Sequence, residues 1–129
     1  MMSSFNLERQ IEYWKNLSLS DILTAEILIE KRRFLHGLFF CNLTIEKALK
    51  AHYVKRNSKL APKTHNLLYL VDNTDLVLND SQMRFLGILL KYQLEGRYPE
   101  NEIDSPTQEI SESYFHQTKE FMEWLIQKL

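Results

Sequence analysis

The stretch of sequence that decides the fold is LHGLFFCNLTIEKALKAHYVKR, residues 35–56. Apolar side chains recur in it every three or four residues, a spacing that places them on one face of an α-helix. The face that we expect to be buried consists of Leu38, Cys41, Ile45, Ala48, Leu49 and His52. A helix with so long an apolar face needs partners of the same kind, so its neighbours in the chain should also be amphipathic helices.

The segment before this helix carries the same pattern. Residues 7–31 have apolar side chains at helical spacing and predict one long helix. Ser18, Ser20 and Asp21 could instead cap a second helix. A break near Leu19 therefore stays open at this point.

Three further helices are expected after residue 56. A short one, over about residues 67–73, follows a loop that ends in a capping residue at Thr64. The next begins between residues 79 and 81 and runs toward Gly96, because glycine suits the position just after a helix. The last begins at SPTQ, residues 105–108, which has the form of a capping box with Pro at the first helical position. Its apolar stripe is expected to consist of Ile110, Tyr114, Phe121, Leu125 and Leu129.

Together these segments predict an all-α protein, an up-and-down antiparallel bundle of four long helices and one short helix. The sequence has three Gly and three Pro. Roughly nine and six would be average for this length, and the low counts favour helices over a loop-rich β fold. Because 129 residues are enough for one domain and too few for two, residues 1–129 are expected to form a single domain.

Cysteine content and hydropathy indicate a cytoplasmic protein. The one cysteine, Cys41, excludes a disulfide within the chain and fits a reducing compartment. The longest apolar run, residues 35–45, is far shorter than the roughly 20 residues that cross a bilayer. We therefore expect no membrane association.

Common catalytic and cofactor-binding motifs are absent from the sequence. Glycine occurs only at positions 37, 87 and 96, which excludes phosphate-binding and dinucleotide-binding glycine loops. Paired metal ligands such as Cys-x-x-Cys or His-Glu-x-x-His are missing as well. We expect neither a metal nor a cofactor.

Charge is distributed unevenly along the chain, although the formal total is −1. Residues 47–63 contain six Lys or Arg and no Asp or Glu, whereas residues 95–123 contain eight acidic and two basic residues. The basic segment could bind phosphate or an RNA backbone, or it could complement the dipole at a helix C-terminus. His65 also has a functional and a structural interpretation. It could line an anion site at a helix start, or it could simply follow a cap.

Four short motifs, taken together, resemble the HEPN domain from about residue 8 onward. They are Trp14, Asp21 and Ala25, then IEKALKA at residues 45–51, THNL at residues 64–67 and RYP at residues 97–99. The resemblance implies an all-α bundle that is commonly a homodimer. It also implies one of two functions, a metal-independent endoribonuclease or a module that works beside a minimal nucleotidyltransferase and is proposed to bind nucleotides.

The ribonuclease motif of this family, Arg followed after four to six residues by His, is absent here. The positions that would follow Arg97 are Glu102, Ile103 and Asp104, and none of the four histidines has an Arg at the required distance before it. A missing general acid or base typically lowers the rate by roughly 100- to 10,000-fold. We therefore expect no efficient cleavage of RNA.

The function implied is a non-catalytic nucleotide-binding or partner-binding module that acts as a homodimer with a separate minimal nucleotidyltransferase, in a pair like a toxin and its antitoxin. The residues expected to bind nucleotide or phosphate are Arg97, Tyr98, Lys47, Lys50 and His65. An arginine offers a bidentate fork to phosphate. Lys47 and Lys50, three residues apart on a helix, could face one ligand or could pair with acidic residues of the first or last helix.

Two alternatives remain at the level of sequence. One is an RNA-cleaving toxin with a diverged site, in which Arg97 works with His65 or His52. The other is a structural dimerisation domain without a ligand, in which Arg97 pairs with neighbouring acidic residues.

Overall fold

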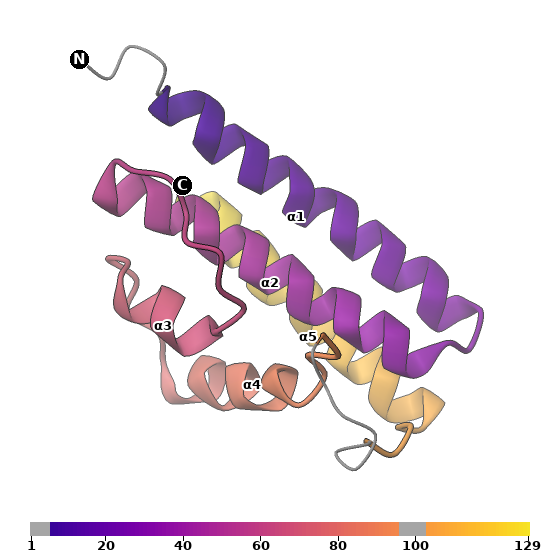
Figure 1. The fold of residues 1–129 in the computed structure, drawn as a ribbon. Helices are drawn as coiled ribbons and strands as arrows, with labels where there is room; N and C mark the ends of the chain where they lie inside the picture. Colours follow the sequence, from indigo (N-terminus) through magenta and orange to yellow (C-terminus); the bar gives the residue numbers. More distant parts are fainter. Residues whose placement is uncertain (1–5, 96–102) are drawn as a thin grey trace.

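The computed structural model describes residues 6–95 and 103–129, and within these ranges the regular structure is entirely helical (Figure 1). The five helices are α1 Leu7–Glu30, α2 Phe34–Asn57, α3 Leu67–Asp72, α4 Asp80–Leu90 and α5 Gln108–Gln127. The prediction of an all-α fold is confirmed. Of the four helices expected to be long, α1, α2 and α5 have 24, 24 and 20 residues, whereas α4 has 11.

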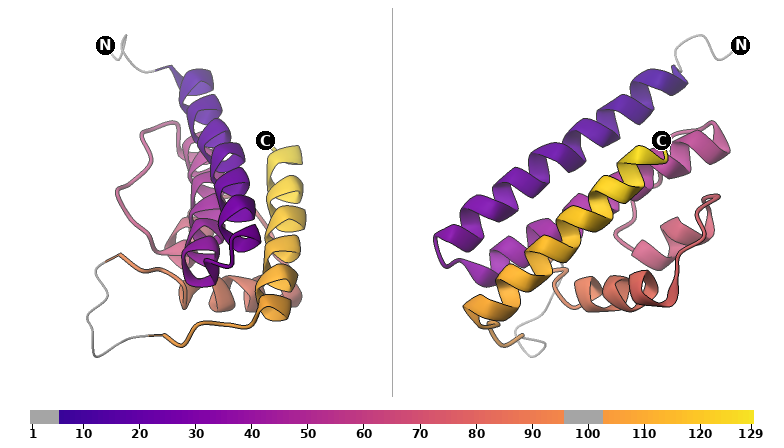
Figure 2. Two further views of the ribbon diagram at one scale, coloured as in Figure 1. Left: turned by 90° about the vertical axis from the view of Figure 1, so that its right-hand side faces the viewer. Right: turned by 180° about the vertical axis from the view of Figure 1, so that it is seen from behind.

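Helix α2 lies at the centre of the fold and contacts each of the other four helices. It forms an antiparallel hairpin with α1, and α5 lies along both (Figure 2). Helices α1, α2, α4 and α5 alternate in direction, as expected for an up-and-down bundle (Figures 1 and 2). The short α3 runs in the same direction as α2, because residues 58–66 return along α2 before α3 begins.

Helix α1 is continuous, and the break considered near Leu19 does not occur. Two of the candidate caps, Ser18 and Asp21, point toward α2, and their contacts explain why the helix continues. The Ser18 hydroxyl donates a hydrogen bond to the Thr44 carbonyl at 2.7 Å, and the Asp21 carboxylate lies 2.9 Å from Lys47 Nζ. Both side chains therefore join α1 to α2 and do not begin a new helix.

Two N-caps differ from those expected. Asn66, and not Thr64, caps α3 by accepting a hydrogen bond from the Tyr69 amide, while the Thr64 hydroxyl accepts one from the Asn66 amide. Thr107, and not Ser105, caps α5 by accepting from the Ile110 amide. In each case two suitable caps stand two residues apart, and the nearer one to the helix is used.

Helix α4 begins as expected but ends earlier. Asn79 and Gln82 form a capping box at its start. The helix ends at Leu90, well before Gly96, which lies outside the described residues. The Asn42 amide of α2 donates to the Leu89 carbonyl at 2.9 Å and satisfies one of the last carbonyls of α4. The same carbonyl also accepts from the Tyr92 amide at 2.9 Å, so Asn42 joins the end of α4 to α2 beside the turn that closes the helix.

The core lies where α2 meets its partners. Every residue of the predicted buried face of α2 is buried. On α5, Phe121 and Leu125 of the expected stripe are buried, Tyr114 and Leu129 are partly buried, and Ile110 is exposed. The buried face also includes residues outside that stripe: Ser111, Phe115, Thr118 and Met122. The hydroxyls of Ser111 and Thr118 bond to carbonyls four residues earlier, so these side chains pack as small core residues.

Candidate functional site

A buried carboxylate, Glu46 of α2, organises the most charged part of the interior. Its side chain is 1% exposed and lies between a lysine and a histidine. Oε2 is 3.2 Å from Lys50 Nζ, and Oε1 is 3.0 Å from His65 Nδ1. Because Lys50 follows Glu46 by four residues, both project from the same face of α2. The side chain of Lys50 is itself only 6% exposed.

A tryptophan of α1 covers the buried ammonium group. Lys50 Nζ lies 5.0 Å from the centroid of the Trp14 ring, within the range of a cation–π contact. The ring thus shields the Glu46–Lys50 pair from solvent on the α1 side. We call Trp14, Glu46, Lys50 and His65, with Glu95, the Glu46 cluster.

His65, just before α3, contacts a second carboxylate at the surface. Its Nε2 lies 2.8 Å from Glu95 Oε2, and its side chain is 46% exposed. A carboxylate only accepts hydrogen bonds, and a neutral imidazole has one donor. Because both ring nitrogens of His65 face carboxylates, the geometry fits the protonated ring, which donates from both. Two carboxylates then balance Lys50 and the imidazolium.

The structure separates the two lysines expected to share a ligand. Lys47 pairs with Asp21 of α1 at 2.9 Å, and Lys50 pairs with Glu46 on its own helix. For Lys47, the alternative of a salt bridge to the first helix is the one observed. Lys50 and His65 are brought together through Glu46. Arg97 and Tyr98 lie outside the described residues.

Sequence reasoning named Lys50 and His65 without their acidic partners. The spacing of Glu46 and Lys50 was a usable signal, because residues four apart on a helix are neighbours. Glu95 and Trp14 come from distant parts of the chain, and no local pattern links them to His65 or Lys50. A contact of this kind is visible only once the helices are packed.

His52, which was considered for a diverged ribonuclease site, makes a buried contact between two helices. Its Nε2 is 2.7 Å from the Leu125 carbonyl of α5, which fits donation by a neutral ring. Burial lowers the pKa of His52, and the charges of Lys55 and Lys128 lower it further, against an opposing effect of the Leu125 hydrogen bond. The residue therefore joins the C-terminal ends of α2 and α5 as an uncharged group near neutral pH.

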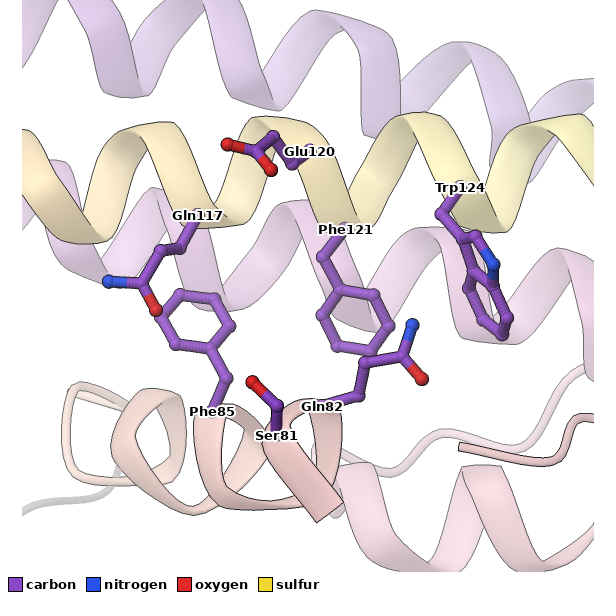
Figure 3. A pocket seen from close by; sticks show the side chains of 7 residues that line it. All are labelled: Ser81, Gln82, Phe85, Gln117, Glu120, Phe121 and Trp124. Carbon is purple, nitrogen blue, oxygen red and sulfur yellow. The ribbon is translucent and has the colours of Figure 1, made fainter. Parts of the chain in front are cut away.

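Hollows elsewhere on the molecule do not coincide with the Glu46 cluster. One of about 280 Å³ lies between α4 and α5, where Phe85, Phe121 and Trp124 project into the space between the helices (Figure 3). A second, of about 360 Å³, lies at the ends of α2 and α5 beside His52. A third, of about 210 Å³, lies between α1 and α5. The Glu46 cluster is not part of these three hollows.

Two other kinds of feature are absent over residues 6–95 and 103–129. No group of three or more His, Cys, Asp or Glu side chains is placed to hold a metal ion. In the same ranges, no helix combines the length and apolar character needed to cross a membrane.

Comparison with known proteins gives a family match and a structural match. The family model for the HEPN domain matches residues 11–129. The crystal structure of TT1696 from Thermus thermophilus is similar, with a TM-score of 0.79 and 18% sequence identity over 93% of this chain and 98% of that one. At this identity the likeness concerns the fold. No curated protein matches significantly.

Proposed function

The chain belongs to the HEPN domain family, and from this we propose that it is a non-catalytic nucleotide-binding and partner-binding module. In this proposal it acts as a homodimer beside a separate minimal nucleotidyltransferase. The chain has no Gly-Ser followed by Asp-x-Asp, so transferase chemistry would come from the partner. The proposed binding residues are His65, Arg97 and Tyr98, with Lys50 and Lys47 in a supporting role.

The observation that carries this proposal is the position of His65. Its ring is oriented from inside by the buried Glu46, and its Nε2 faces the surface, where Glu95 lies 2.8 Å away. Arg97 and Tyr98 follow Glu95 in the sequence by two and three residues. A fixed imidazolium donor and an arginine two residues beyond its partner Glu95 in the sequence are suitable groups for a phosphate, since hydrogen bonds between charged groups are the strong ones.

Lys47 and Lys50 have a supporting role in this site. Each is already paired with a carboxylate, so neither is available as a primary phosphate ligand without losing that partner. The Lys47–Asp21 pair joins α2 to α1, whereas the Lys50–Glu46 pair lies within α2 and contacts α1 through the Trp14 ring. We propose that these two lysines maintain the structure of the site and do not contact the ligand directly.

Exposed apolar side chains on α1 support the homodimer. Leu19, Leu23 and Ile27 are exposed and follow one another at intervals of four residues, which places them on one face of the helix. Glutamate at Leu23 and Ile27 should convert a dimer to a monomer in analytical ultracentrifugation. A dimer that persists in this double variant would exclude α1 as the interface.

Thermal unfolding against nucleoside mono-, di- and triphosphates, with and without magnesium, tests the ligand. A ligand at about 100 times its Kd should add about 2.7 kcal/mol, or a few degrees in Tm for a domain of this size. The shift should disappear in Arg97→Ala and His65→Gln and persist in Arg84→Ala, a matched loss of charge at an exposed position of α4. Unchanged Tm values with every nucleotide would overturn nucleotide binding.

A diverged ribonuclease is the second candidate, and one observation favours it. His65 contacts Glu95, which stands two residues before Arg97, so a histidine and an arginine could meet although the sequence motif is missing. Incubation with structured and single-stranded RNA distinguishes the two functions. Cleavage by the wild type that is lost in both Arg97→Ala and His65→Ala would replace our proposal with this one.

A further inference from the structure

We propose that Glu95 occupies the place of the ligand's phosphate on His65, so that ligand binding exchanges one anion for another. This inference rests on the proposed function, since it concerns the same imidazole. It adds a regulatory role for a residue that no sequence motif includes. The ligand class is a phosphate monoester or free phosphate, which carries the same kind of charged acceptor as a carboxylate.

The two carboxylates on His65 differ strongly in burial. Glu46, on Nδ1, has a side chain that is 1% exposed, whereas Glu95, on Nε2, has one that is 54% exposed. Exposed ion pairs contribute little to stability, while breaking a buried one is expensive. Glu46 is therefore a fixed part of the site, whereas Glu95 can move away from His65 with little loss of stability.

The net charge of the Glu46 cluster changes when Glu95 moves away from His65. With the His65 ring donating from both nitrogens, Glu46 and Glu95 balance Lys50 and the imidazolium. Without Glu95 the cluster carries one surplus positive charge, on a ring that is 46% exposed. That surplus belongs to the half-exposed ring, since Lys50 is covered by Trp14 and paired with Glu46.

The orientation of the ring does not depend on Glu95. Glu46 accepts from Nδ1 at 3.0 Å and is itself held by Lys50, so the direction of Nε2 is set from the inside. A phosphate oxygen needs the same geometry as a carboxylate oxygen, a charged donor at about 2.7–2.9 Å. The donor that Glu95 now uses is therefore preorganised for a phosphate.

Titration with inorganic phosphate, followed by NMR of the His65 ring, tests the exchange. The probe should bind wild type weakly and bind Glu95→Gln about three- to tenfold more tightly, because a competing surface carboxylate is gone. Glu123→Gln, which removes an equal charge from an exposed position of α5, should leave the affinity unchanged. In His65→Gln, which has no ring signal at this position, the backbone amide resonances around residue 65 should no longer respond to phosphate.

The outcomes separate the inference from the proposed function. Phosphate binding that requires His65 but is equal or weaker in Glu95→Gln would overturn the exchange and leave the ligand site intact. Equal tightening in Glu95→Gln and Glu123→Gln would mean a general effect of net charge and would also overturn it. Absence of binding to both wild type and Glu95→Gln would overturn the anion site at His65, and the exchange with it.

Discussion

Glu46 and Lys50 form an ion pair inside the bundle, with 3.2 Å between Oε2 and Nζ and with side chains that are 1% and 6% exposed. A buried pair of this kind is weak support for stability as a whole, because desolvation offsets much of the attraction. Losing one partner is different, since the other charge then stays buried without compensation. The pair is therefore a sensitive point of the fold.

Glu46→Gln should lower the free energy of unfolding by about 3–5 kcal/mol, because it leaves the Lys50 ammonium buried against a neutral amide. Denaturant unfolding at neutral pH measures this. Glu95→Gln, at the exposed end of the same cluster, should change stability by less than about 1 kcal/mol. Adding Lys50→Met to Glu46→Gln should recover most of the loss. A Glu46→Gln variant within about 1 kcal/mol of wild type would contradict the buried pair.

Two glycines in helices should respond oppositely to alanine. At Gly37 in α2, a Cβ would lie 2.5 Å from Cγ1 of the buried Ile29, so Gly37→Ala should destabilise by about 1–2 kcal/mol. At Gly87 in α4 the added Cβ would meet no described atom within 4 Å apart from its chain neighbours and its own helix backbone. Gly87→Ala should therefore stabilise by about 0.5–1 kcal/mol, as alanine loses less conformational entropy in a helix. Equal effects in thermal unfolding would contradict the close approach of α1 and α2 at Gly37.

Cys41 should resist thiol reagents while the protein is folded. Burial raises the pKa of the Cys41 thiol from 9.0 to about 12, against a smaller opposing effect of the Thr118 hydroxyl. The thiolate fraction at neutral pH falls about a thousandfold with such a shift, and the side chain is fully buried. Labelling with an aromatic disulfide should be complete only in denaturant. Rapid labelling of the native protein would show that α2 is not packed as described.

Stability should decrease as the pH falls below about 6.5, partly because of His52. Burial lowers the pKa of His52 in the folded state, so the unfolded chain binds a proton there at a higher pH than the folded chain does. The loss should have a slope of up to about 1.4 kcal/mol per pH unit down to the folded pKa.

His52→Gln isolates this effect, because the Gln amide can still donate to the Leu125 carbonyl. Between about pH 7.0 and 5.5, on either side of the ordinary histidine pKa of about 6.5, the variant should lose less stability than wild type in parallel denaturant titrations. His116→Gln, at an exposed position of α5, should follow the wild type. Identical profiles for wild type and His52→Gln would mean that His52 titrates alike in both states.

The parts of the fold that follow from local patterns could be predicted from the sequence. The buried face of α2 is the clearest case, because its apolar residues recur without interruption. Part of the buried face of α5 was missed because Ser111 and Thr118 count as polar in any pattern, yet their hydroxyls bond within the helix and pack as small core groups. The end of α4 was misjudged because a glycine is only one way to end a helix, and this helix ends at Leu90 with turn hydrogen bonds from the Lys91 and Tyr92 amides.

The candidate site divides in the same way. Lys50 and His65 stand in short motifs and could be singled out as residues, and Glu46 was within reach through its spacing to Lys50. That His65 lies between Glu46 and Glu95 depends on a return of the chain along α2, for which the sequence carries no local signal. The charged side chains could be identified from the sequence. The pairing of each charge with its partner could not.

The short connection between α1 and α2 has a consequence for the order of folding. Only residues 31–33 separate the two helices, so closing this hairpin costs little chain entropy, whereas residues 58–107 separate α5 from α2. We expect the hairpin to be largely formed in the folding transition state and α5 to dock afterwards. Truncations such as Ile22→Val and Ile45→Val in the hairpin should then slow folding, while Leu125→Ala in α5 should mainly speed unfolding.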